Sequence, residues 1–141
     1  MTAAPTPEAM AETHAAAFAP SRPWRREEFT DLLATPGCFA VGDAACFALV
    51  RVIAGEAELL TIATDPAHRR QGLARDRMAA WMDAAVTRGA TRAFLEVAAD
   101  NPAARALYHA TGFAETGKRP GYYSRPGLPA CDAVVMSRDL P

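Results

Sequence analysis

A change of hydrophobic period in the middle of the chain constrains the fold more than any other feature. Residues Glu56 to Thr64 have the apolar pattern of a strand, and from Ala74 onward apolar residues recur at helical spacing. The strand pattern returns from Arg92 to Ala98. A strand, a helix and a strand in this order form a right-handed crossover, which joins parallel strands of one sheet. The unit from Glu58 to Val97 therefore predicts a parallel pair within a mixed sheet.

Two helices are expected upstream of this unit. Thr6 is suited to cap a first helix, with Pro7 at its first position, that runs to about Ala17. A second, short helix carries Phe29, Leu32 and Leu33 on one face.

Three short strands follow these helices. The turns between them, Gly42-Asp43 and Ala54-Gly55, are too short for a crossover, so the strands must be antiparallel neighbours. The predicted strands are Cys38 to Val41, Ala44 to Ile53 and Glu56 to Thr64.

The helix of the crossover is amphipathic. Its apolar face consists of Ala74, Met78, Trp81 and Ala85. Three charged residues, Arg75, Arg77 and Asp83, fall mostly on the other side, and Gly89 is suited to end the helix.

The last third of the chain adds one helix and two strands. Asn101 is suited to cap the helix, Pro102 to occupy its first position, and Gly112 to end it. The strands are predicted at Phe113 to Lys118 and at Asp132 to Met136. The element order ααβββαβαββ predicts an α+β fold. A mixed, mostly antiparallel central sheet with one parallel β-α-β unit is flanked by about four helices, in a single domain over residues 1–141.

Composition narrows the classes of partner. The chain has 141 residues, half of them hydrophobic, and a formal net charge of -1, so no global charge attracts it to nucleic acid or to a membrane surface. No apolar run approaches the ~18 residues of a membrane span, and no signal peptide is recognisable, so the cytoplasm is the expected location.

Cysteine and histidine usage argues against a metal site. The three cysteines are an odd number without a CxxC pair, and the three histidines are scattered. No metal is therefore expected. No Cys–His pair suggests an acyl-enzyme, so any acyl transfer should be direct.

The loop before the crossover helix has the character of an anion site. The first N–H groups of a helix lack partners within the helix, and the helix dipole makes that end partly positive. Gly72 lets the backbone approach a phosphate closely, and Arg69 and Arg70 add positive charge. A pyrophosphate would fit the backbone N–H groups from Arg70 to Arg75. By spacing alone, a solvated basic helix start explains the loop equally well.

Arg69-x-x-Gly72-x-Ala74, between a strand and a helix, resembles the acetyl-CoA motif of the GNAT superfamily of N-acetyltransferases. Four further segments match the second half of that family's core in order and spacing. They are Leu95-Glu96-Val97, Asn101-Pro102-Ala103-Ala104, Ala106-Leu107-Tyr108 and Gly112-Phe113.

Within that superfamily the chain is most similar to the ribosomal-protein alanine N-acetyltransferases (the RimI type). The resemblance covers roughly Pro23 to Leu140. It rests on Pro23-Trp24, Ile62-Ala63-Thr64-Asp65-Pro66, Gly121-Tyr122-Tyr123 and Asp132-Ala133 to Met136.

The resemblance implies acetyl-CoA as co-substrate and a peptide or protein N-terminus as acceptor. Residues implied to bind acetyl-CoA are Ile62, Ala63, Thr64, Arg69, Arg70, Gln71, Gly72, Leu73, Ala74, Arg75 and Asn101. Trp24, Tyr122 and Tyr123, with the loop from Pro20, are implied to wall the acceptor groove.

The resemblance also implies that Glu96 is the general base and Tyr108 the general acid. The chemistry agrees, because an α-amine with pKa ~7.7–8.0 must lose a proton to attack a thioester, and the leaving thiolate gains from a proton donor. Glu96 lies in an otherwise apolar strand, where desolvation favours proton uptake. Without a catalytic role, Glu96 would be an ordinary solvent-facing glutamate and Tyr108 a tyrosine of the core.

Three functions are compatible with these patterns. The first is acetylation of the N-terminal alanine of a ribosomal protein. The second keeps the enzyme class but takes a small-molecule amine as acceptor. The third is a CoA-binding sensor or partner protein without catalysis, which would not require both Glu96 and Tyr108. A structural protein with a chance motif is disfavoured by the ordered match.

Overall fold

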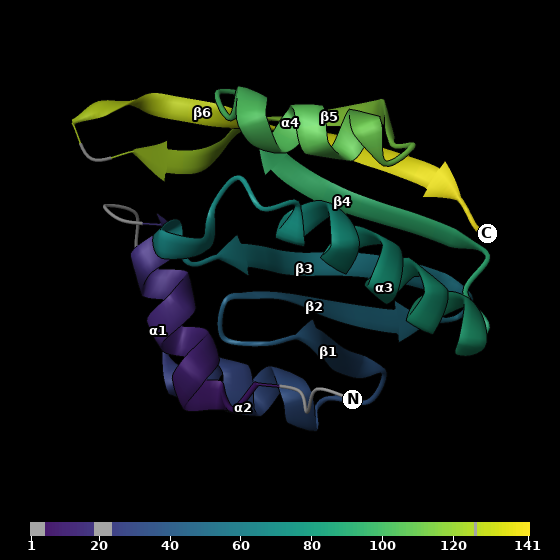
Figure 1. Ribbon diagram of the computed structural model, residues 1–141. Coiled ribbons are helices and arrows are strands. Elements are labelled where there is room, and N and C mark those ends of the chain that lie inside the picture. Colours follow the sequence, from purple (N-terminus) through teal and green to yellow (C-terminus); the bar gives the residue numbers. More distant parts are fainter. Residues whose placement is uncertain (1–4, 19–23, 126) are drawn as a thin grey trace.

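The computed structural model describes residues 5–18, 24–125 and 127–141, and its elements follow the predicted order (Figure 1). The four α-helices are α1 (Pro7–Phe18), α2 (Arg26–Ala34), α3 (Leu73–Thr87) and α4 (Pro102–Ala110), and a short 3₁₀ helix, η1, spans Pro66–His68. The six strands are β1 (Cys38–Gly42), β2 (Cys46–Ile53), β3 (Glu56–Thr64), β4 (Arg92–Ala98), β5 (Ala114–Arg125) and β6 (Leu128–Asp139).

The strands form one mixed sheet in the order β1-β2-β3-β4-β6-β5. Among the strands that the structure describes, only the β3–β4 pair is parallel, and α3 makes the crossover between these two strands. The predicted α+β class, the mixed sheet and the parallel pair are confirmed. Because β6 inserts between β4 and β5, the C-terminal part of the chain lies beside the crossover unit.

Helices cover the two faces of the sheet unequally. The larger apolar cluster lies under α3 and α4 and contains Met78, Trp81 and Tyr108. The smaller cluster lies under α1 and α2, which pack against β3 and β1, and includes Phe29 and Phe47. Neither α1 nor α2 extends over β4, β5 or β6 in Figure 1. Within the described residues, no helix therefore covers the face of these three strands that is turned away from α3 and α4, and we call it the open face.

The helix starts agree with the cap predictions. The Asn101 side chain accepts a hydrogen bond from the Ala104 N–H at 3.1 Å, and Pro102 is the first residue of α4. The Thr6 hydroxyl accepts one from the Ala9 N–H at 3.1 Å, at the start of α1.

Two predictions need correction. The last two strands are much longer than predicted, because register shifts between Arg119 and Tyr123 accommodate Pro120 and Gly121 without ending β5. Arg77 does not lie on the solvent side of α3. Its Nε donates to the Cys46 carbonyl at 2.9 Å, so the side chain packs between the helix and the β1–β2 turn.

The parallel pair separates along its length. Pairing between β3 and β4 starts at Glu56 with Arg92 and ends at Leu59 with Leu95. Both strands then continue, to Thr64 and Ala98, without pairing to each other. Half of the backbone groups of a strand point to each side, so residues 60–64 present peptide groups toward β4 that no described strand takes up. The divergence opens toward the N-terminus of α3 (Figure 1).

Candidate active site

The N-terminus of α3 is built to leave backbone N–H groups available. The first helical hydrogen bond runs from the Asp76 N–H to the Gly72 carbonyl at 3.1 Å, so the preceding N–H groups of residues 73–75 have no partner within the helix. Gly72 occupies the N-cap position with φ 76°, and no side chain caps the helix. By contrast, the α4 start is capped by its own asparagine.

The loop before α3 is held in a strained shape. Arg70 has φ 63°, a left-handed conformation that is costly for a residue with a Cβ. The Asp65 carboxylate accepts from the Ala67 N–H at 2.9 Å, and the Asp65 N–H donates to the Ala45 carbonyl at 2.8 Å. These bonds fix the loop to the β1–β2 turn, so its geometry is set before any ligand binds.

A cavity of about 310 Å³ lies at this helix start. It is lined by Thr64, His68, Arg69, Arg70, Gly72, Leu73, Ala74, Arg75 and Leu107. The structure thus brings together seven of the residues predicted to bind acetyl-CoA. Sequence reasoning missed His68 and Leu107. Leu107 stands next to Tyr108 in the segment Ala106-Leu107-Tyr108 that matched the family, and this position is the signal that could have identified it.

The other predicted cofactor residues lie outside this lining. Gln71 is exposed in the loop itself. Ile62 and Ala63 are on the second half of β3, where Ile62 packs against the larger apolar cluster and Ala63 belongs to the smaller one. Asn101 caps α4. The predicted role of Ile62 and Ala63 needs only their backbone groups, which lie in the diverging part of β3.

Tyr108 lies in the core between α4 and the sheet. Its side chain is 7 % exposed, and its ring meets Phe113 edge-on with centroids 6.3 Å apart. Burial raises the pKa of the Tyr108 phenol above its ordinary value of 10, and the nearby Tyr123 adds to the rise. The hydroxyl therefore keeps its proton at neutral pH and is suited to donate a hydrogen bond.

Glu96 points to the opposite face of β4. Its neighbours Leu95 and Val97 are buried in the cluster that contains Tyr108, and successive strand residues alternate between faces. Its side chain is 18 % exposed and its Oε1 lies 3.0 Å from Nη2 of Arg119. The two predicted catalytic residues are thus on either side of β4, next to the strand that separates from β3.

The predicted acceptor residues form two aromatic groups. The Trp24 ring stacks on His14 with centroids 5.2 Å apart, and the backbone N–H of Trp24 donates to Nδ1 of His14 at 3.1 Å. Tyr122 and Tyr123 meet edge-on at 5.1 Å on β5, and Tyr122 is 52 % exposed. The rest of the predicted wall, residues 20–23, lies outside the described residues.

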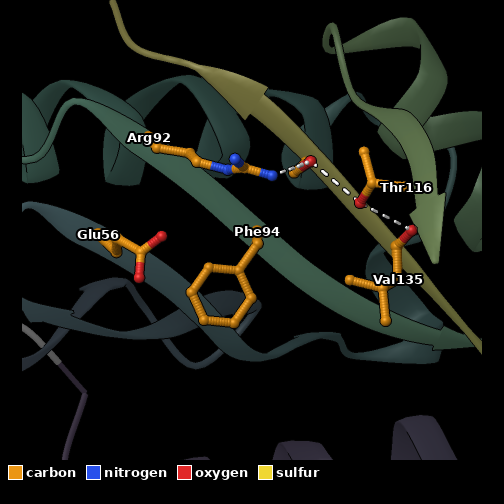
Figure 2. Close-up of a pocket in the computed structure, with 6 residues that line it drawn as sticks. Glu56, Arg92, Phe94, Thr116 and Val135 are labelled. Atoms are coloured by element: carbon orange, nitrogen blue, oxygen red, sulfur yellow. Dashed lines mark hydrogen bonds between the residues drawn. The ribbon is translucent and has the colours of Figure 1, made fainter. Parts of the chain in front are cut away.

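A second hollow lies on the open face of the sheet (Figure 2). It encloses about 300 Å³ and is lined by Glu56, Arg92, Phe94, Thr116, Val135 and Ser137. Val135 is the residue paired with Glu96 across β4 and β6, so this hollow begins one cross-strand step from the Glu96 carboxylate. In Figure 2, Arg92 reaches over the strands to Ser137, to which its Nη2 donates at 3.0 Å.

The described ranges, 5–18, 24–125 and 127–141, contain no group of three or more His, Cys, Asp or Glu side chains that could hold a metal ion. None of their helices is both long enough and apolar enough to cross a membrane.

Similarity to known protein families assigns the chain to one of them. Residues 7–113, well over half of the chain, match the acetyltransferase (GNAT) family. The chain belongs to the GNAT acetyltransferase family. The donor in this family is acetyl-CoA.

Relatives refine the placement among GNAT proteins. The [Ribosomal protein bS18]-alanine N-acetyltransferase of Escherichia coli K12 is 44% identical over 96 residues, which cover 68% of this chain and 64% of the relative. The chain therefore spans less than two thirds of that relative's length. The N-alpha-acetyltransferase RimI of Mycobacterium tuberculosis is 37% identical over 138 residues, which cover 92% of this chain and 84% of the relative.

A solved GNAT structure agrees. The ribosomal-protein-S18-alanine N-acetyltransferase from Escherichia coli superposes with a TM-score of 0.84 and 32% identity, covering 95% of this chain and 87% of that one.

The residues of this GNAT chain fit acetyl-CoA. The pyrophosphate of acetyl-CoA requires hydrogen-bond donors and positive charge, and the α3 start offers uncapped N–H groups beside Arg69, Arg70 and Arg75. Its pantetheine arm is a peptide-like chain, and the diverging half of β3 offers unpaired backbone groups.

Proposed function

We propose that this chain transfers an acetyl group from acetyl-CoA to the α-amine of a protein N-terminus, most specifically the N-terminal alanine of a ribosomal protein. Residues 1–141 act as one N-acetyltransferase domain. The observation that carries the proposal is the divergence of β3 and β4, with an anion-suited cavity at its end and Glu96 and Tyr108 on the two sides of β4.

Donor binding rests on three parts of the chain. The N–H groups at the start of α3, with Arg69, Arg70 and Arg75, hold the pyrophosphate. Backbone groups of residues 62–64 pair with the pantetheine arm as a further strand would. Leu107 supplies an apolar contact from α4.

Proton handling falls to Glu96 and Tyr108. Acetyl-CoA supplies a thioester, whose carbonyl carbon bonds to the amine nitrogen as the bond to sulfur breaks. Glu96, on the open face, accepts the proton that the ammonium must lose, directly or through a water molecule. Tyr108, on the donor side, gives a hydrogen bond to the departing sulfur.

The raised pKa of Tyr108 refines its role. A phenol more basic than usual does not readily release its proton to a thiolate, whose conjugate acid has a pKa of roughly 8.5. Tyr108 therefore acts chiefly as a fixed hydrogen-bond donor to the sulfur. Burial also raises the pKa of the Cys46 thiol, which makes that residue a poor nucleophile and supports direct transfer.

The open face supports an extended acceptor. An N-terminus placed at Glu96 has β4, β5 and β6 beside it, and no helix of the described part of the chain covers them, so several further residues of a peptide have room. The name of the Escherichia coli relative supports alanine at the N-terminus, and that of the Mycobacterium tuberculosis relative supports an α-amine as acceptor. A ribosomal protein as acceptor would place the reaction in the cytoplasm.

Acetyl transfer measured against two acceptors in parallel tests the proposal. One is a short peptide with a free N-terminal alanine, and the other is a panel of small amines, with release of free thiol as readout. Turnover on the peptide that is lost when its N-terminus is blocked is the expected result. Turnover on small amines alone would overturn the acceptor, and CoA binding without any turnover would favour a sensor.

A further inference from the structure

Arg119 forms an ion pair with the Glu96 carboxylate. Its Nη2 lies 3.0 Å from Oε1 of Glu96, and the arginine side chain is 57 % exposed against 18 % for the glutamate. The two residues come from β5 and β4, which are not neighbours, because β6 lies between them. On β6 their partners are Ala133 and Val135, so the ion pair crosses the open face diagonally over one strand.

The same guanidinium also contacts the aromatic group on β5. Its Cζ lies 5.2 Å from the ring centroid of Tyr122, within the range of a cation–π interaction. Tyr122 in turn packs edge-on against Tyr123, with ring centroids 5.1 Å apart. Arg119 therefore connects the proposed base to the proposed acceptor wall.

This position has two physical consequences. A glutamate side chain has three rotatable bonds, and the guanidinium restricts them, so the carboxylate stays at one place on the open face. A second cation that arrives there competes with the guanidinium for the same oxygens. An ion pair with a largely exposed arginine is weak enough to exchange, because water screens it.

We propose that Arg119 is a positioning residue that acts through Glu96. It holds the carboxylate in the site before the acceptor binds, and it yields one oxygen to the α-ammonium of the acceptor while its own guanidinium remains over Tyr122. The proposal rests on the proposed function, since it takes Glu96 as the base.

A double-mutant cycle separates action through Glu96 from other roles. Arg119→Gln removes the charge but keeps much of the side chain, and we expect kcat for the alanine peptide to fall about tenfold without a rise in KM. Arg119→Lys, which keeps the charge, should recover part of the loss. In a Glu96→Gln background, Arg119→Gln should change kcat by less than about twofold, because the group through which it acts is gone.

A matched control is available on the same sheet. Arg51 on β2 pairs with Glu58 on β3, with Nη2 of Arg51 2.7 Å from Oε1 of Glu58, and neither residue belongs to the proposed site. Arg51→Gln therefore removes a cross-strand Arg–Glu pair and should leave kcat and KM unchanged. Affinity for CoA, measured by calorimetry, should be unchanged in both arginine variants.

Two outcomes would overturn the proposal while leaving the proposed function intact. A tenfold loss that persists in the Glu96→Gln background would show that Arg119 does not act through Glu96. A loss confined to KM would make Arg119 an acceptor-binding residue. Failure of the proposed function is distinct, because the unaltered chain would then not acetylate the peptide at all.

Discussion

At the scale of single residues, the chemistry depends on two side chains that lie on opposite faces of one strand. The Glu96 carboxylate pairs with Arg119 on the open face, whereas Val97, beside Glu96 in the sequence, is buried in the same cluster as Tyr108. Because successive side chains of a β-strand alternate between its faces, the proposed base lies on the face that the acceptor would approach. The proposed hydrogen-bond donor to the sulfur, Tyr108, lies on the other face. One strand can separate the two halves of the reaction in this way only because β3 moves away from it.

Replacing Glu96 by glutamine should abolish base catalysis and little else. The amide has almost the same shape, so CoA affinity should stay unchanged, while kcat falls by roughly 10²- to 10⁴-fold. The free energy of unfolding should fall by no more than about 1 kcal/mol, because the ion pair with Arg119 is lost. Steady-state kinetics with the alanine peptide, together with calorimetric CoA titration, check this. Unchanged turnover would remove Glu96 from the mechanism.

Tyr108 should make the stability of the fold depend on pH in the alkaline range. Its folded-state pKa lies above the unfolded value of about 10, so the folded state retains a proton that the unfolded state loses. The stabilisation is complete below pH 10 and is lost as the pH rises beyond it, by up to about 1.4 kcal/mol per pH unit. Denaturant unfolding of Tyr108→Phe should show a shallower decline above pH 10.

The exposed Tyr122 provides the control for that measurement. Its side chain is 52 % exposed, so Tyr122→Phe removes a phenol hydroxyl from the surface and leaves the core as it is. Equal slopes in the unaltered chain and in Tyr108→Phe would contradict the assignment of this effect to Tyr108.

At the scale of elements, sequence patterns predicted what depends on local periodicity. The strands Glu56–Thr64 and Arg92–Ala98 and the cap of α4 agree with their predictions, because period and capping chemistry are local properties. The sequence underestimates the length of β5, because Pro120 and Gly121 are residues typical of a strand end. Only the pairing with β6 shows that bulges absorb them.

The two ends of α3 offer a matched test of the anion site. Gly72 and Gly89 have φ 76° and 90°, and a Cβ at either would meet nothing within 4 Å. Alanine at either position should therefore cost about 1 kcal/mol of unfolding free energy through backbone strain alone. Gly72→Ala should also weaken CoA binding, because it lies at the phosphate-binding end, whereas Gly89→Ala should not. Equal CoA affinity in both variants would argue against a pyrophosphate at this helix start.

At the scale of the whole molecule, the site is assembled from segments that sequence spacing cannot bring together. Resemblance named Glu96 and Tyr108, but the Arg119–Glu96 ion pair exists only because β6 lies between β4 and β5. The cavity likewise joins Thr64 at the end of β3, the start of α3 and Leu107 of α4. A strand order and a divergence are properties of the complete sheet, so motifs could indicate the chemistry without giving its geometry.

CoA binding at this site should protect some parts of the chain from hydrogen exchange more than others. CoA at 100 times its Kd should raise the free energy of unfolding by about 2.7 kcal/mol, which slows hydrogen exchange at every amide that exchanges through global unfolding. Amides that exchange through local opening should slow only where the ligand makes contact. We expect extra protection at residues 60–64 of β3 and 73–75 of α3, and none at the edge strand β1. Protection in β1 equal to that in β3 would mean that CoA does not occupy the divergence, because the unpaired half of β3 is the part that a strand-like ligand would complete.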